Sequence, residues 1–473
     1  MPNIEVKTRT DEKVILQEQV VKAFEKRLRG ELIQSQSKGY DEARTIWNAM
    51  IDKRPSIIVR CSGVADVIET VHFARENDLL VAVRGGGHNI AGAAVCDKGL
   101  MIDLSSMRAI HADPEAQTAR VQGGATFADV DHETQAFGLA VPSGVISTTG
   151  VGGLTLGGGF GRLSRAYGLT ADNLLSADVI TADGVLVTAS AKKNSDLFWG
   201  IRGGGGNFGI VTSFEFKLHK VGPEVLFGPI VYPLEDAAEA LRNYRNFASS
   251  APNECSIWAD FLTAPPLPFL PEAVYGTKVL FIVPFYTGDR QEGEEILRPL
   301  REYGKPIADA VMATPYVTAQ RALDDFYAKG SRNYWKSHNF TELSDTALDT
   351  IVKYAGKLPT SQSDILISHL GGVINDIASD GTAYPHRDLS FVVTPGGRWE
   401  DSAQDDGPIA WVQECFEALT VHATGQSYVN FIAESEGRER EAFGPNYDRL
   451  VELKNKYDPA NLFRLNQNIT PTV

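Results

Sequence analysis

Glycine is concentrated in three short stretches of this chain, at residues 85–87, 150–161 and 203–209. Each stretch lies at the end of an apolar run that we expect to form a strand. Glycine lets the backbone approach a ligand closely, and successive N–H groups without bulky side chains can surround an anion such as a pyrophosphate. One such loop would be an ordinary turn, but three of them favour a nucleotide-binding site.

Residues 153–161, with the sequence GLTLGGGFG, lie within the second stretch. They differ from the dinucleotide-binding fingerprint, because the order strand, G-x-G-x-x-G, helix is missing. An acidic residue about twenty positions later, after a second strand, is missing as well. We therefore do not expect NAD binding, and a nucleotide would be held in another way.

The chain has 473 residues and a formal net charge of −15. The length favours two domains. The acidic charge argues against nucleic acid as a partner, because phosphate backbones attract basic surfaces. We expect neither a metal site nor a disulfide framework, since H-E-x-x-H is absent from the sequence and the four cysteines are far apart, at Cys61, Cys96, Cys255 and Cys415.

The N-terminal residues 1–16 mix charged and apolar side chains and contain no hydrophobic stretch of signal-peptide length. The uncharged stretch 138–161 is interrupted by Pro142 and rich in glycine, which makes it a poor membrane span. We therefore expect a cytoplasmic protein without a membrane partner.

Apolar spacing predicts an amphipathic helix at 64–77, followed by a short buried strand at 79–83. Residues 177–189 favour two strands joined by a turn at 182–184, and a further strand is expected at 208–214. A charged helix is expected at 446–457, where Asp458-Pro459 ends it. Glycine becomes sparse from about residue 221 to about 414, which indicates an inserted second domain.

His88 follows three glycines at the end of the expected 79–83 strand. Taken alone, a histidine in such a loop is most often a hydrogen-bonding residue. The sequence around it gives it a more specific interpretation.

Six segments of the chain resemble one protein superfamily. They are VAVRGGGHNIAG (81–92), GLMIDLSSM (99–107), residues 141–173, DLFWGIRGGGGNFGIVTSFEF (196–216), SYVNF (427–431) and residues 446–469. The first four are similar to the FAD-binding domain of the vanillyl-alcohol oxidase and p-cresol methylhydroxylase (PCMH) superfamily. The last two resemble the C-terminal element of its berberine bridge enzyme-like branch. Residues 220–414 match weakly, apart from TAYPHRD (382–388).

The resemblance implies an α+β fold with two domains. A PCMH-type FAD-binding domain, made of two α/β subdomains, would comprise residues 1–219 and be completed by residues 415–473. A substrate domain at residues 220–414 would contain an antiparallel sheet covered by helices.

The resemblance also implies that His88 is bonded to the 8α-methyl carbon of FAD. Ile146 stands where some relatives have a second tethering cysteine, so we expect a single covalent link, and Leu154 stands where a histidine is common. The residues expected to contact FAD are Arg84, Gly85, Gly86, Gly87, Asn89, Thr148, Thr149, Gly152, Gly153, Gly158, Gly161, Gly209, Val211, Asn430 and Asn468.

Tyr428 is the expected catalytic base, because many relatives place a catalytic tyrosine in the same Tyr-x-Asn sequence. An alcohol needs a base to take its O–H proton as hydride leaves for the flavin N5. Positive charge or hydrogen bonds nearby would stabilise the phenolate, and Asn430 would orient the tyrosine or the flavin. Other relatives use a glutamate or glutamine at positions that are Val392 and Thr394 here, and neither is a useful base.

His369 and Tyr384 are secondary candidates in the substrate domain, and each is more often a structural residue in such a place. Thr149 occupies the position that partly controls oxygen access in relatives, where valine or leucine is usual. The choice between oxidase and dehydrogenase therefore stays open.

These features favour an FAD-dependent oxidase of a hydroxylated small molecule, such as a sugar, an alcohol or a secondary metabolite. Molecular oxygen is the expected electron acceptor, with hydrogen peroxide as the product. Oxidation of an amine or alkaloid at a C–N carbon is an alternative, as are a dehydrogenase with another acceptor and a flavin-binding module without turnover. The sequence does not distinguish a monomer from a homodimer.

Overall fold

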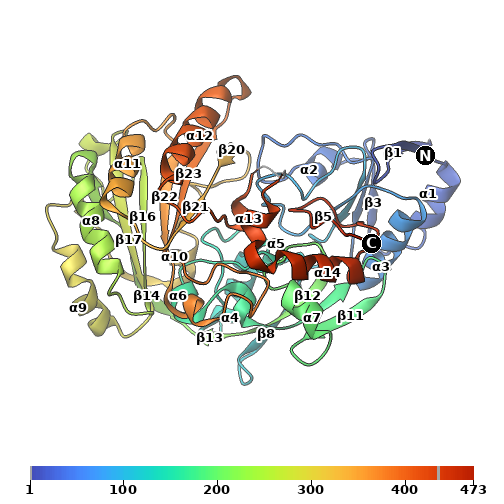
Figure 1. Cartoon of the computed structure of the whole chain (residues 1–473), viewed down its shortest axis with the longest axis horizontal. Coiled ribbons are helices and arrows are strands. Elements are labelled where there is room, and N and C mark those ends of the chain that lie inside the picture. The colour runs from blue at the N-terminus through green and yellow to red at the C-terminus, as the bar shows by residue number, and fades with distance from the viewer. Residues whose placement is uncertain (1–2, 434–436) are drawn as a thin grey trace.

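The computed structural model describes residues 3–433 and 437–473. Within these residues one ten-stranded sheet, one five-stranded sheet and one four-stranded sheet carry the fold. In Figure 1 the ten-stranded sheet occupies the left half, and the two smaller sheets lie in the right half together with both termini.

The four-stranded sheet has the strand order β3-β4-β6-β5, with β4 and β5 both parallel to β6. Helix α3 connects β4 to β5 across β6, and it confirms the helix predicted at 64–77. The predicted strand at 79–83 begins two residues later, because the N–H of Leu79 still bonds to the Ala74 carbonyl at the end of α3. The bounds are β3 Glu31–Ile33, β4 Ile57–Arg60, α3 Val64–Glu76, β5 Val81–Arg84 and β6 Leu100–Asp103.

The five-stranded sheet is antiparallel, with the order β11-β10-β12-β8-β7. Strands β10 and β11 confirm the predicted hairpin, and Gly184 supplies the positive φ of its turn (+79°). The strand predicted at 208–214 begins instead at Ile210, because Gly209 has a φ of +154° and breaks the strand geometry. The bounds are β7 Ile110–Asp113, β8 Thr118–Gln122, β10 Leu174–Ile180, β11 Leu186–Ser190 and β12 Ile210–Lys217.

Short helices and two-stranded sheets surround these two sheets. The predicted C-terminal helix is confirmed as α14, which packs against α7 (Figure 1). The elements are β1 Ile4–Lys7, β2 Lys13–Leu16, α1 Glu18–Glu25, α2 Tyr40–Arg44, α4 Phe127–Gln135, β9 Leu139–Ala140, α5 Val151–Leu156, α6 Ser164–Tyr167, α7 Ser195–Gly200, β13 His219–Lys220, α13 Glu439–Phe443 and α14 Tyr447–Tyr457.

The ten-stranded sheet is antiparallel and follows the order β18-β15-β17-β16-β22-β23-β20, with β14, β19 and β21 paired beside this path. Its strands are β14 Glu224–Phe227, β15 Ile230–Pro233, β16 Cys255–Thr263, β17 Lys278–Tyr286, β18 Ala308–Asp309, β19 Met312–Pro315, β20 Arg332–Trp335, β21 His338–Phe340, β22 Asp364–His369 and β23 Phe391–Trp399.

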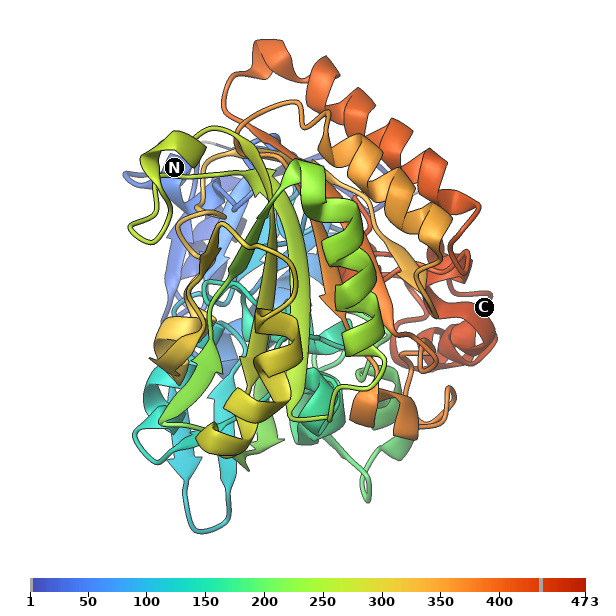
Figure 2. The ribbon, with the colours of Figure 1, turned by 90° about the vertical axis from the view of Figure 1, so that its left-hand side faces the viewer.

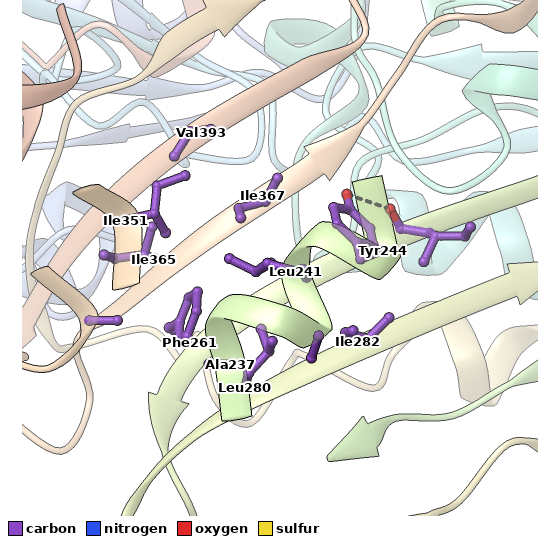
Figure 3. Close-up of a cluster of buried hydrophobic side chains, with 14 of the residues drawn as sticks. Ala237, Leu241, Tyr244, Phe261, Leu280, Ile282, Ile351, Ile365, Ile367 and Val393 are labelled. Atoms are coloured by element: carbon purple, nitrogen blue, oxygen red, sulfur yellow. Dashed lines mark hydrogen bonds between the residues drawn. The ribbon is translucent and has the colours of Figure 1, made fainter. Parts of the chain in front are cut away.

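Four helices cover one face of this sheet, as Figures 1 and 2 show: α8 Ala237–Ala248, α9 Arg290–Arg301, α11 Asp345–Ala355 and α12 Asp406–Thr420. Alternate residues of β16 face this layer, so that Ile257 and Phe261 pack among the helices while Trp258 points to the opposite side. Figure 3 shows this core, where the Tyr244 hydroxyl donates a hydrogen bond to the Ile257 carbonyl (3.1 Å). The short helix α10 Tyr316–Gln320 contacts β14 and β19.

The predicted α+β fold, with an antiparallel sheet covered by helices, is confirmed. The boundary predicted at residue 415 falls in the middle of α12, and that helix packs on β23 through Val412 and Cys415 among others. We therefore propose that the second domain extends through α12 to Thr424, whose N–H still donates to the Asn339 carbonyl of β21. Among the described residues no helix is both long and apolar enough to cross a membrane.

Candidate active site

The three glycine stretches meet at one cavity between the smaller sheets and the ten-stranded sheet. The glycines at the cavity are Gly85, Gly86 and Gly87 of the first stretch, Gly150, Gly152 and Gly153 of the second, and Gly205, Gly206 and Gly209 of the third. The neighbouring residues His88, Asn89, Thr149 and Asn207 line the cavity beside them. We call the nine glycines named here the glycine wall. The C-terminal tail adds Tyr428 to Phe431, Phe463 and residues 465–467.

Close backbone approach explains why the glycine wall needs glycine. A Cβ atom on Gly86 would lie 2.4 Å from the Gly150 nitrogen, and one on Gly150 would lie 2.3 Å from the Gly86 nitrogen. The first two stretches therefore touch backbone to backbone. Gly153 differs, since a Cβ there would meet no atom within 4 Å, and the residue lines the cavity. A side chain at Gly153 would project into the space that a ligand needs.

His88 lies on the cavity wall, after the three glycines that follow β5. Its Nε2 is 3.0 Å from the Thr148 hydroxyl, and its ring stacks on Trp47 with the centroids 5.3 Å apart. Burial, and secondarily the positive charge of Lys329, lowers the pKa of His88 to about 4. The imidazole is therefore neutral at neutral pH, and no hydrogen bond joins its Nδ1 to a residue that the structure describes.

Tyr428 is buried at the same cavity, and its hydroxyl oxygen accepts hydrogen bonds from the Gly159 N–H (3.1 Å) and the Asn430 side-chain amide (2.8 Å). Burial raises the pKa of Tyr428 to about 12, although these two hydrogen bonds lower it. The expected hydrogen bonds are present, but burial outweighs them. The phenol keeps its proton at neutral pH, so its O–H can donate a hydrogen bond to a ligand.

Asn430 joins the tail to the second glycine stretch. Its amide nitrogen donates to the Leu154 carbonyl (3.2 Å) as well as to Tyr428. A Cβ on Gly157 would lie 2.2 Å from the Asn430 side-chain oxygen, so glycine is needed there. The bond to Tyr428 is the contact through which Asn430 would orient the tyrosine.

Aromatic side chains form another part of the cavity lining, which we call the aromatic wall. The ring centroids of Phe160 and Tyr428 are 4.6 Å apart, and that of Phe431 is 5.0 Å from Tyr428. The indole N–H of Trp335 is buried and has no hydrogen-bond partner among the described residues. The residues of the aromatic wall are Phe160, Trp258, Trp335, Tyr428 and Phe431.

The residues lining the cavity in the described part of the chain include no Asp, Glu, Lys or Arg. Since His88 is neutral, the cavity presents no formal charge of its own. A ligand group bound against these side chains is best uncharged, because burying an unpaired charge is costly, whereas an anionic group needs the backbone N–H groups of the glycine wall.

Comparison with known proteins identifies the family. Residues 55–190 match the family described as FAD binding domain, and residues 427–470 match the family described as berberine and berberine like. An FAD-linked oxidoreductase from Dictyostelium discoideum is 32% identical over 458 residues, which cover 96% of this chain and 97% of that protein. The chain belongs to the berberine bridge enzyme-like FAD-linked oxidoreductases.

Three further comparisons agree with this family. The (R)-6-hydroxynicotine oxidase of Paenarthrobacter nicotinovorans is 29% identical over 456 residues, covering 94% of this chain and 97% of the relative. The structure of 6-hydroxy-D-nicotine oxidase from Arthrobacter nicotinovorans has a TM-score of 0.83 at 28% identity, covering 93% of this chain and 98% of that one. Berberine bridge enzyme from Eschscholzia californica shares the fold, with a TM-score of 0.85 at 22% identity over 96% of this chain and 99% of that one. The chain is therefore an FAD-linked oxidoreductase, as predicted.

The cavity of this berberine bridge enzyme-like chain fits FAD. The open space beside Gly153 can admit a ligand. The side-chain oxygens of Asn466 and Gln467 are buried without partners among the described residues, although both residues line the cavity. Unpartnered buried acceptors of this kind suit the donors of a nucleotide. Glycine backbone N–H groups of the same lining suit its phosphates.

Most of the predicted cofactor residues lie at the cavity, but several do not. The cavity is lined by Gly85, Gly86, Gly87, His88, Asn89, Thr149, Gly152, Gly153, Gly209, Val211, Tyr428 and Asn430. The predicted residues outside the lining are Arg84, Thr148, Gly158, Gly161 and Asn468.

Each residue outside the lining has another contact. Arg84 donates to the Ala43 carbonyl, and Thr148 bonds to His88. A Cβ on Gly158 would lie 2.9 Å from the Tyr384 ring, and one on Gly161 would lie 1.9 Å from the Ser143 carbonyl oxygen, so both glycines serve packing. The Asn468 side chain makes a weak hydrogen bond to the Thr470 hydroxyl (3.5 Å), and Asn466 and Gln467 line the cavity instead.

The secondary candidates of the substrate domain also lie outside the lining. His369 bonds to Arg165 (3.0 Å), and burial lowers its pKa well below the usual value, which supports a structural role. The ring centroid of Tyr384 lies 6.2 Å from that of Tyr428, and Tyr384 does not line the cavity. Val392 and Thr394 are buried on β23.

Sequence reasoning missed Asn207, Asn466 and Gln467, and it missed the aromatic wall except for Tyr428. Asn466 and Gln467 lie in the tail motif that led to Asn468, so that motif was the available signal. No comparable signal marked Trp258 and Trp335, because strand register alone brings them to the cavity. The described residues contain no cluster of His, Cys, Asp and Glu that could hold a metal ion.

Proposed function

We propose that this oxidoreductase holds FAD by a single covalent bond to His88 and oxidises a small, uncharged aromatic molecule. The observation that carries the proposal is the state of His88, a neutral imidazole on the cavity wall with Nδ1 free. A neutral nitrogen with an available lone pair is a nucleophile, whereas a protonated imidazole is not. Thr148 supports the proposal, because its bond to Nε2 orients the ring.

A single link is supported by Ile146, which lines the cavity where some relatives have a tethering cysteine. An aliphatic side chain cannot form a second bond to the flavin. When bound, FAD supplies the hydride acceptor for substrate oxidation, and we propose molecular oxygen as the final electron acceptor.

The aromatic wall supports an aromatic substrate. Offset and edge contacts between rings contribute about 0.5–1.5 kcal/mol each beyond the area they bury. The unpartnered N–H of Trp335 and the O–H of Tyr428 could both donate to an oxygen or nitrogen of the substrate. The absence of charged side chains from the described lining favours the neutral form of that substrate.

Between a C–N and a C–O carbon as the site of oxidation, Tyr428 favours C–N. An alcohol requires a base for its O–H proton, but a tyrosine with a pKa of about 12 is a weak source of phenolate at neutral pH. A neutral amine needs no such base, because its own lone pair assists the loss of hydride. The similarity to (R)-6-hydroxynicotine oxidase agrees with this choice.

The test is a panel of neutral aromatic amines and aromatic alcohols, read by anaerobic bleaching of the flavin in the unaltered enzyme and in Tyr428→Phe. We expect an amine to bleach the flavin, with the rate in Tyr428→Phe within about threefold of the unaltered enzyme. If only alcohols bleach the flavin, and the bleaching rate falls about a hundredfold in Tyr428→Phe, Tyr428 is the general base after all. A flavin that no compound of the panel reduces would contradict the proposed aromatic substrate.

A further inference from the structure

A fully buried ion pair closes helix α14. Lys454 and Asp458 both have 0% exposed side chains, and the Lys454 ammonium lies 2.7 Å from the Asp458 carboxylate. Burial lowers the pKa of Lys454, while the Asp458 carboxylate raises it. Removing two charges from water is costly, so such a pair adds little net stability by itself. The pair matters instead for the segments that its hydrogen bonds hold together.

The Lys454 ammonium bonds to two segments that are far apart in the chain. It donates to the Asn207 carbonyl (2.9 Å) and to the Phe463 carbonyl (3.0 Å), and Asp458 takes its third bond. All three donors of the ammonium are therefore used. Asn207 belongs to the third glycine stretch and Phe463 to the tail, and both residues line the cavity.

Asp458 fixes the tail from the other side of the pair. Its carboxylate accepts the backbone N–H groups of Leu462 (2.8 Å) and Phe463 (2.9 Å). The turn after α14 therefore delivers Phe463 to the cavity in a defined orientation. Charge-assisted bonds of this kind are about twice as strong as neutral ones.

The side chain of Asn207 joins the same two segments. Its amide donates to the carbonyls of Gly204 (2.9 Å) and Gln467 (3.1 Å), and its oxygen accepts the Ile469 N–H (3.0 Å). Asn466 adds a bond to the Gly206 carbonyl (3.2 Å). Loop 203–209 and tail 463–469 are thus one bonded unit, and part of each lines the cavity.

We propose that Lys454 is a positioning residue for FAD, because its ammonium holds loop 203–209 and tail 463–467 in the arrangement that admits the cofactor. The proposal depends on FAD binding, which family membership provides, and not on the covalent bond to His88. Lys454 itself does not line the cavity, so its effect passes through the carbonyls that it holds.

The experiment measures the dissociation constant for FAD, by quenching of flavin fluorescence, in a His88→Ala background where attachment is prevented. Lys454→Met removes the ammonium. Lys454→Met with Asp458→Asn removes both charges and so avoids an unpaired buried carboxylate. The matched control is Lys456→Met on the same helix, which breaks the exposed pair of Lys456 with Asp196 (2.6 Å).

We expect both Lys454 variants to bind FAD at least tenfold more weakly, and the control to bind within twofold of the parent. The double variant should recover the melting temperature of the FAD-free parent without recovering its affinity for FAD, which a merely structural role would not produce. Parental affinity in the double variant, an equal loss in the control, or a double variant that does not fold would each overturn the proposal. If His88→Ala binds no FAD, the flavin content per chain of the same variants with His88 intact decides.

Discussion

The two walls of the cavity are built by different means. The glycine wall is backbone, drawn from three stretches that the sequence marks clearly, and at Gly86 and Gly150 a single added methyl group would collide with it. The aromatic wall is made of large side chains from the tail, the loop after α5 and two strands of the ten-stranded sheet. A backbone wall suits a constant ligand such as a cofactor. A side-chain wall can change with the substrate.

The largest effect is expected at His88, which follows the first glycines of the glycine wall. His88→Ala should abolish covalent attachment, because no other residue is proposed to form the bond. After acid denaturation and centrifugation, the colour should move entirely from the protein pellet to the supernatant. Colour that stays with the pellet of the variant would place the link on another residue.

The glycine wall should no longer bind FAD well when a side chain occupies the open space beside Gly153. Gly153→Val should lower bound FAD per chain at least tenfold, while the stability of the FAD-free protein changes by about 1 kcal/mol or less. Gly407→Val is the control, because Gly407 also lies in the first turn of a helix with no atom within 4 Å of an added Cβ. Equal flavin content in the two variants would mean that FAD lies elsewhere.

The aromatic wall should respond more weakly. Trp335→Phe keeps a ring but removes the unpartnered N–H. For a substrate with a hydrogen-bond acceptor, kcat/KM should fall about fivefold, which corresponds to the loss of one hydrogen bond of about 1 kcal/mol. A substrate analogue without that acceptor should be unaffected. A similar loss for both compounds would assign Trp335 to packing alone.

The smallest effect is expected from pH. The pKa of Tyr428 is raised to about 12 and that of His88 lowered to about 4, so the phenol stays protonated and the imidazole neutral across the neutral range. For an amine substrate that is neutral throughout this range, kcat/KM should change less than about threefold between about pH 6 and pH 9. A steep rise with pH would show a base that titrates in this range.

Much of the fold followed from local patterns. Helices at 64–77 and 446–457 and the hairpin around Gly184 are confirmed within one or a few residues, because apolar spacing and turn residues act over short distances. Strand starts at Val81 and Ile210 came later than predicted, since a helix-end hydrogen bond and a positive φ at Gly209 ended the preceding segments. Neither the hydrogen bond nor the positive φ can be predicted from the pattern of hydrophobic residues.

For the site, the sequence by itself determined the glycine stretches, the position of His88, and the pairing of Tyr428 with Asn430, because each is encoded within a few consecutive residues. Only the tertiary structure decided that Trp258 and Trp335 face the cavity and that Asn466 and Gln467 do so in place of Asn468. It also decided that burial keeps Tyr428 protonated. Strand register, burial and the meeting of distant segments are properties of the whole fold, so no local pattern carries them.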